Sequence, residues 1–201
     1  MTDNRLTIPG EARGPVEPVK PATVSSSSSP VRTGLEWVVV IAGALLVALV
    51  VKTFLFQAFF IPSVSMDPTL KVGDRVLVNK LSYDFHDVRR GDIVVFRSPP
   101  GEANATVKDL IKRVIGLPGE TVEARDGHVV IDGQALNEPY LRDGASTSPL
   151  DPHKVPPGHI WVMGDNRQNS KDSRFFGAID EHLIVGRAFI RVWPITSLSL
   201  L

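Results

Sequence analysis

Thr121-Val122-Glu123-Ala124-Arg125-Asp126-Gly127-His128-Val129-Val130-Ile131 contains two short apolar or alternating runs joined by two residues. Alternation of apolar and polar residues with a period of two is typical of β-strands. The linker Asp126-Gly127 favours a tight hairpin, because both central positions of such a turn need a positive φ. This stretch therefore predicts antiparallel β structure.

Runs of the same kind continue on both sides of this hairpin, separated by turn residues. Further strands are expected at 75–79, 92–96, 111–115, 160–163 and 184–192. Proline-rich loops are expected around residues 99–101 and over 148–158, and a single helical turn over 178–183. The pattern predicts a mostly β, largely antiparallel domain without internal repeats.

The N-terminal part of the chain has a different composition. Residues 1–34 are rich in Pro and Ser and contain only scattered apolar residues, which predicts a disordered tail. Residues 35–51 are almost wholly apolar with only Glu36 charged, and with the residues to 56 they could cross about 30 Å of hydrocarbon. A buried core helix and a cleaved signal peptide are the alternatives, but the stretch has no polar face and no small-x-small cleavage site follows it. The expected division is a tail at 1–34, a transmembrane anchor at 35–56 and a β-rich domain at 57–201.

Composition excludes several classes of function. The 201 residues carry 22 Lys plus Arg and 22 Asp plus Glu, so there is no basic excess for nucleic acid to bind. The absence of cysteine excludes thiol catalysis, disulfides and cysteine-ligated zinc. No His-Glu-x-x-His segment or Gly-rich phosphate loop is present, so no metal or cofactor is predicted. The five histidines lie in turns or polar stretches, and a histidine triad is not predicted.

Ser65 is a candidate nucleophile. It lies in Ile61-Pro62-Ser63-Val64-Ser65-Met66-Asp67-Pro68-Thr69-Leu70, directly after the apolar span. A serine hydroxyl attacks poorly until a neighbouring base accepts its proton. Taken alone, Ser63 and Ser65 are more typical of hydroxyls in a turn.

Lys112 is a candidate base for Ser65. It lies in Ile111-Lys112-Arg113-Val114-Ile115-Gly116-Leu117-Pro118-Gly119 and shares one face of the expected strand with Leu110 and Val114. Burial on an apolar face disfavours the ammonium form and lowers the pKa of a lysine. The alternative is an edge-strand lysine whose amine reaches solvent.

A third segment is a dense polar loop, Gly164-Asp165-Asn166-Arg167-Gln168-Asn169-Ser170-Lys171-Asp172-Ser173-Arg174. Such composition usually indicates a turn held by side-chain-to-backbone hydrogen bonds. The three segments together resemble the type I signal peptidases, and Gly91-Asp92-Ile93-Val94-Val95-Phe96 matches a further box of that family. The resemblance extends over about residues 56–193, with Val64 standing where many members have glycine.

The resemblance implies a role for each matching residue. Ser65 would be the nucleophile and Lys112 the general base, with Ser63 and the Ser65 backbone N–H forming the oxyanion hole. Ser170 would orient the lysine. Three further residues would hold the site from behind: Asp165, Asp172 and Arg174.

The resemblance also implies a fold, a substrate and a location. Antiparallel sheets would form a partly closed, barrel-like catalytic domain after one N-terminal transmembrane helix. The substrates would be exported preproteins, cut after small residues in an Ala-x-Ala-like pattern, at the outer face of the plasma membrane with the N-terminus in the cytoplasm. A self-cleaving Ser/Lys repressor and a bitopic binding domain without activity are the rival interpretations. The apolar span argues against the first, and the presence of Ser65 and Lys112 argues against the second.

Overall fold

The computed structural model describes residues 30–51, 55–100 and 108–201 of the chain. Most of the predicted tail at 1–34 and residues 52–54 of the predicted anchor lie outside the described residues. The contacts divide the chain into two compact units, residues 1–43 and residues 44–201.

The described helices are one long helix and several single turns. They are α1 (Pro30–Val50), α2 (Ser82–Phe85), α3 (Ser173–Phe176), and the 3-10 turns η2 (Glu181–Leu183) and η3 (Ile195–Ser197). Apart from Glu36, every described side chain of α1 is uncharged, and those from Trp37 to Leu49 are exposed. None of the helices in the described ranges combines the length and the hydropathy of a membrane span, so the anchor at 35–56 stays a prediction.

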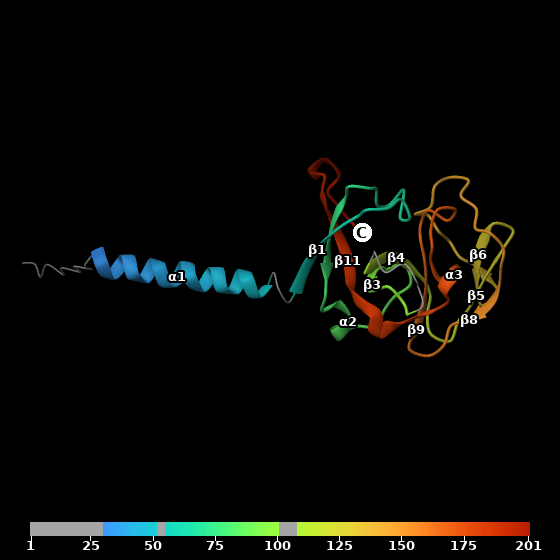
Figure 1. Ribbon diagram of the computed structural model, residues 1–201, viewed down its shortest axis with the longest axis horizontal. Coiled ribbons are helices and arrows are strands. Elements are labelled where there is room, and N and C mark those ends of the chain that lie inside the picture. The colour runs from blue at the N-terminus through green and yellow to red at the C-terminus, as the bar shows by residue number, and fades with distance from the viewer. Residues whose placement is uncertain (1–29, 52–54, 101–107) are drawn as a thin grey trace, which may run out of the picture. The chain divides into compact units, whose positions relative to one another are not determined.

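All described strand pairs are antiparallel, which confirms the predicted mostly β fold. The larger sheet has the order β1-β2-β11-β3-β4-β9-β10, with β12 added beside β11. Figure 1 labels β1, β11, β3, β4 and β9 of this sheet. Its strands are β1 (Phe56–Phe60), β2 (Arg75–Asn79), β3 (Ile93–Arg97), β4 (Asp109–Gly116), β9 (His159–Met163), β10 (Ile179–Asp180), β11 (Ile184–Trp193) and β12 (Ser199–Leu200). Neither end of this path pairs with the other among the described strands, so the sheet stays open.

A smaller sheet has the order β7-β6-β5-β8. Its strands are β5 (Thr121–Arg125), β6 (His128–Ile131), β7 (Gln134–Ala135) and β8 (Leu150–Lys154). The predicted hairpin joins β5 to β6, and both Asp126 and Gly127 have positive φ, at 52° and 82°. The tight hairpin turn predicted from Asp126-Gly127 is therefore confirmed.

Apolar side chains of the larger sheet pack in two of the clusters that the described residues form. Ile61, Met66 and Leu70, which flank Ser65 in sequence, are 0–1% exposed and pack with β2 and β3 in one cluster. Trp161 and Met163 of β9 pack against the smaller sheet in a second cluster. The segment that carries Ser65 is thus held on the core of the larger sheet by its own apolar residues.

Three predictions of local structure differ from the structure. Phe56, the expected end of the anchor, begins β1 and pairs with Asn79. Residues 150–154 form β8 although they were expected in a loop; Pro152 is tolerated because β8 is the edge of its sheet. The expected helical turn at 178–183 is shared between β10 and η2.

Candidate functional site

Ser65 lies in the connection between β1 and β2. The residue is 7% exposed, and the buried Met66 that follows it fixes the chain against the core. Two backbone bonds brace the connection, from Ile61 N to the carbonyl of Asp74 at 2.9 Å and from Leu70 N to the carbonyl of Met66 at 2.8 Å. The hydroxyl therefore occupies a fixed and largely water-free position.

Lys112 points at Ser65 from β4. Its Nζ donates to Ser65 Oγ at 2.7 Å and to the carbonyl of Ile111 at 3.0 Å, and the residue is 3% exposed. The residues are 47 positions apart in sequence. They meet because the Ser65 segment packs on β2 and β3, and β4 pairs with β3. A nucleophile and a base at this distance meet the geometric requirement for proton transfer.

Burial lowers the pKa of the Lys112 ammonium from its ordinary value to about 8. Water stabilises the ammonium more than the protein interior does, so desolvation favours the neutral amine. The charges of Asp172 and Asp165 act in the opposite direction, and that of Arg174 adds to the lowering. At pH 7 about a tenth of the protein thus holds a neutral amine beside the hydroxyl, far more than for a lysine in water.

Ser63 lies beside the candidate nucleophile but closer to solvent. Its Oγ is 3.3 Å from Ser65 Oγ, and its side chain is exposed. Within the described part of the chain, the Ser65 backbone N–H donates to no acceptor. A hydroxyl and a free N–H are the donor types that stabilise an oxyanion.

Asp165 connects the polar loop to β4 and to the Ser65 segment. Arg113 donates to both of its oxygens, at 2.9 and 2.7 Å, and Thr69 Oγ1 donates to it at 2.5 Å. The Asp165 side chain is fully buried and that of Arg113 nearly so. Two parallel bonds of this kind fix both orientation and distance.

Asp172 organises the other end of the same loop. It receives two bonds from Arg174 at 2.8 Å and one from the Gly164 backbone N–H at 2.9 Å, and it caps the short helix α3. These bonds join the two ends of the loop, and Asp165 and Asp172 are both buried. The structure thus places Asp165, Asp172 and Arg174 in this loop, and their predicted role in holding the site stays a prediction.

Ser170 is the residue predicted to orient Lys112, but the structure shows no hydrogen bond between the two side chains. Its Oγ is buried and has no hydrogen-bond partner among the described residues. A Cβ added at Gly164 would collide with both Ser170 Oγ and the carbonyl oxygen of Ser65. The Ser170 hydroxyl thus lies near the Ser65 backbone without a bond to Lys112, and its role stays a prediction.

Sequence reasoning gave no role to several residues that support the site. The Tyr140 ring lies 3.9 Å from the centre of the Arg113 guanidinium, and Thr69 binds Asp165. Arg167 pairs with Glu138 and donates to Thr147 at 2.8 Å. Thr69 and Arg167 belong to the matched segments, but Tyr140, Glu138 and Thr147 come from loops with no motif to mark them.

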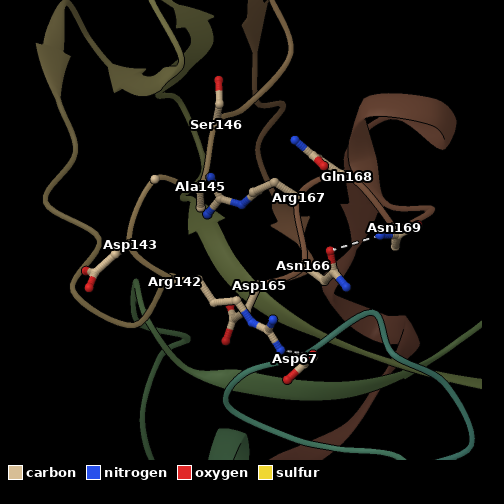
Figure 2. Close-up of a pocket in the computed structure, with 11 residues that line it drawn as sticks. Asp67, Arg142, Asp143, Ala145, Ser146, Asp165, Asn166, Arg167, Gln168 and Asn169 are labelled. Atoms are coloured by element: carbon tan, nitrogen blue, oxygen red, sulfur yellow. Dashed lines mark hydrogen bonds and ion pairs between the residues drawn. The ribbon is translucent and has the colours of Figure 1, made fainter.

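A cavity of about 310 Å³ opens beside the site. Its walls are residues 142–146 and 165–169, with Asp67 at one end, as Figure 2 shows. Asn166 reaches from this cavity to the nucleophile segment, where its N–H donates to the Ser65 carbonyl at 3.0 Å. The cavity therefore adjoins the serine without containing it.

Comparisons with known proteins agree on one family. The sequence model described as "Signal peptidase, peptidase S26" matches residues 34–193. Signal peptidase I of Leptolyngbya laminosa is 43% identical over 202 residues, covering 94% of this chain and 95% of that protein. Signal peptidase IB of Staphylococcus aureus is 37% identical over 178 residues, covering 80% of this chain and 90% of that protein. A crystal structure of a signal peptidase I from Enterococcus faecalis V583 shares 33% identity at a TM-score of 0.43, over 51% of this chain and 97% of that chain.

Proposed function

The chain belongs to the signal peptidase family, peptidase S26, and from that premise we propose that Ser65 and Lys112 form its catalytic dyad. The family makes the chain a serine peptidase that acts on the signal peptides of preproteins. The observation that carries the dyad is the buried contact of 2.7 Å between Lys112 Nζ and Ser65 Oγ.

The proposed reaction has two halves. Neutral Lys112 takes the proton of Ser65 Oγ as the oxygen attacks the scissile carbonyl, and the resulting ammonium gives that proton to the departing amine as the peptide bond breaks. The signal peptide remains as an ester on Ser65. Lys112, neutral again, takes a proton from water, whose oxygen attacks the ester carbonyl. As the bond between that carbon and Ser65 Oγ breaks, the proton returns to Ser65 Oγ and the signal peptide leaves with a free carboxyl end.

The oxyanion is proposed to bind the Ser65 N–H and the Ser63 hydroxyl. The free N–H and the 3.3 Å separation of the two serine oxygens support this assignment. Each such donor is worth about 3–4 kcal/mol of transition-state stabilisation. No cofactor or metal ion takes part in this scheme.

Ser170, Asp165, Asp172 and Arg174 are proposed to position the dyad. Asp165 holds Arg113, the residue after Lys112, and Asp172 holds the backbone of Gly164. Both acids also favour the ammonium form of Lys112 as it develops during the attack. Ser170, whose hydroxyl is buried and has no partner among the described residues, is proposed to accept a hydrogen bond from the Lys112 amine and so orient it.

The substrate is proposed to bind as an extended strand with small, Ala-x-Ala-like residues before the cut. β3 pairs with Asp109–Arg113 of β4 on one side. On the other side, β9 pairs only from Arg113 onward, and no described strand covers residues 109–112. An open strand edge beside the nucleophile accepts a peptide by backbone hydrogen bonds.

Residues 35–56 are proposed to anchor the protein in the plasma membrane as a single span, with the N-terminal tail in the cytoplasm and the catalytic domain outside. The family is membrane-associated, and the exposed apolar side chains of α1 support this placement. The proposed partners are the lipid bilayer and preproteins, with no nucleic acid. Holding enzyme and substrate on one surface raises their effective concentration.

Cleavage of a purified preprotein in detergent tests the dyad. Ser65→Ala and Lys112→Met should each lower kcat at least about 10³-fold, because either removes the nucleophile or its base. Ser148→Ala and Lys154→Met are matched controls, since both side chains are exposed. Comparable activity in a dyad variant and its control would refute the dyad, provided that circular dichroism shows both folded.

A further inference from the structure

The cavity beside Ser65 is built from two loops of different origin. Residues 142–146 precede β8 of the smaller sheet, and residues 165–169 follow β9. Figure 2 shows the Arg142 side chain reaching from the first loop to Asp67, two residues after Ser65, with Asp143 on the rim. The ion pair between Arg142 and Asp67 closes one end of the cavity.

The cavity shares its wall with the nucleophile segment. Asn166, which lines it, donates through its backbone N–H to the Ser65 carbonyl at 3.0 Å and through Nδ2 to the Val64 carbonyl at 3.2 Å. A peptide bond held at Ser65 therefore has this cavity as its neighbour on one side.

The cavity and the open edge of β4 both lie next to the proposed dyad. Lys112 is the last residue of that edge, and Arg113, the next residue, binds Asp165 in the cavity wall. An extended peptide that follows the edge toward Ser65 therefore continues past the nucleophile toward residues 165–169. One end of the substrate lies on the edge and the other end enters the cavity.

The side chains near the β4 edge and those that line the cavity indicate which end of the substrate binds at each place. The half-buried apolar side chains of Phe59 and Ile111 pack against the cluster beneath the edge, which suits small apolar residues before the cut. The cavity is lined by five ionisable residues and several amides instead. A polar, open cavity has no means of selecting small apolar side chains, but it can solvate the polar start of a mature chain.

Four of the five charged residues that line the cavity are in ion pairs, and the fifth is an aspartate. Its lining contains three aspartates and two arginines. Arg142 pairs with Asp67, Asp165 with Arg113, and Arg167 with Glu138. Asp143 is exposed and has no ion pair with any residue that the structure describes, so the rim carries a net negative charge. In addition, Asp67 Oδ1 is buried without a hydrogen-bond partner among the described residues, which leaves an acceptor for a peptide N–H.

We propose that this cavity binds the first residues of the mature protein, those that follow the cleaved bond, and that Arg142 and Asp143 set its charge preference. The inference rests on the proposed cleavage at Ser65 and adds a binding site for the leaving fragment. Because the free carboxylate lies at the rim, a lysine in the mature segment is favoured over a glutamate. The effect is modest, up to about fivefold in kcat/KM, because exposed charge pairs are weak and screened by salt.

The test measures kcat/KM of the full-length protein in detergent on synthetic signal-peptide substrates. Each substrate carries either Lys or Glu at one of the first four positions after the cut, and a second set carries them at positions before the small residues. Asp143→Asn should bring the Lys/Glu ratio toward one, because it removes the free charge. Arg142→Gln should raise the ratio, because it uncovers the charge of Asp67. Asp151→Asn, an exposed aspartate in β8 outside the cavity, is the matched control and should leave the ratio unchanged.

The outcomes separate this inference from the proposed function. Opposite shifts in the two cavity variants, seen only for positions after the cut and reduced by salt, support the mature-chain site. Unchanged ratios in both variants, shifts of the same sign, or shifts confined to positions before the cut overturn it while cleavage itself persists. If the unsubstituted protein cleaves none of the substrates, the proposed function fails and the inference fails with it.

Discussion

The proposed role of Lys112 as a base requires that its side chain can lose its charge. A lysine in water has a pKa near 10.4 and is almost wholly protonated at neutral pH. At 3% exposure the amine loses most of its hydration, and this desolvation outweighs the opposing charges of Asp172 and Asp165. The resulting pKa of about 8 leaves the amine partly neutral near neutral pH and basic enough to take the proton of a hydroxyl.

The pH dependence of cleavage follows from this pKa. Only the neutral amine accepts a proton, so kcat/KM should be constant well above pH 8 and should fall tenfold per unit below it. At pH 6 the loss should be about 100-fold. Initial rates between pH 5 and pH 10 on one peptide substrate measure the profile, and circular dichroism over the same range checks that the protein stays folded. A flat profile down to about pH 5 would contradict a lysine base.

At the scale of elements, two Arg–Asp pairs hold the loops around the dyad, and they differ in burial. Arg113 of β4 and Asp165 after β9 are joined by two bonds with side chains 9% and 0% exposed. Arg142 and Asp67 join two loops with the arginine side chain 62% exposed. The desolvated pair is rigid and costly to break, whereas water competes for the exposed one.

This difference predicts unequal stability losses. Asp165→Ala leaves the Arg113 guanidinium buried without its carboxylate and should lower the free energy of unfolding by about 3–5 kcal/mol. Arg142→Ala removes only the exposed pair and should cost less than about 1 kcal/mol. Urea unfolding followed by tryptophan fluorescence gives both values. Equal losses in the two variants would mean that the Arg113–Asp165 pair does not hold β4 to the loop.

At the scale of the whole molecule, the site depends on strands from the start and the end of the domain. β1 pairs with β2, and β11 lies between β2 and β3, so residues near 56 and near 190 both support the sheet that carries Lys112. The catalytic domain therefore needs β1. The described strand pairs of this sheet involve no residue before β1.

Shortening the chain tests the proposed anchor. A protein that starts at Leu55 retains β1 and should cleave short peptides with the same kcat/KM and pH profile as the full chain. It should cleave a preprotein embedded in lipid vesicles more slowly, by roughly 10²-fold, because the effective concentration on the surface is lost. Flotation of both proteins with vesicles measures their binding. Equal binding and equal vesicle rates would contradict an anchor at residues 35–56.

Local pattern was sufficient for most strands and insufficient for a few. The alternating runs correctly predicted β2, β5 and β6, because their burial alternates along the strand or ends at a marked turn. β8 and β10 were not predicted. Four of the five residues of β8 are exposed and β10 has only two residues, so neither shows a periodic pattern. Such strands exist because a neighbouring strand supplies their hydrogen bonds.

The same division holds for the site. The motifs, the hairpin turn and the apolar face of Lys112 could be predicted from the sequence, because each is a property of residues close together in the chain. The 2.7 Å approach of Lys112 to Ser65, the unpaired hydroxyl of Ser170 and the cavity beside Arg142 could not be predicted. Each depends on the placement of residues that are far apart in sequence. Desolvation and ion pairing depend on what surrounds a group in space, and only the packing of the two sheets establishes those surroundings.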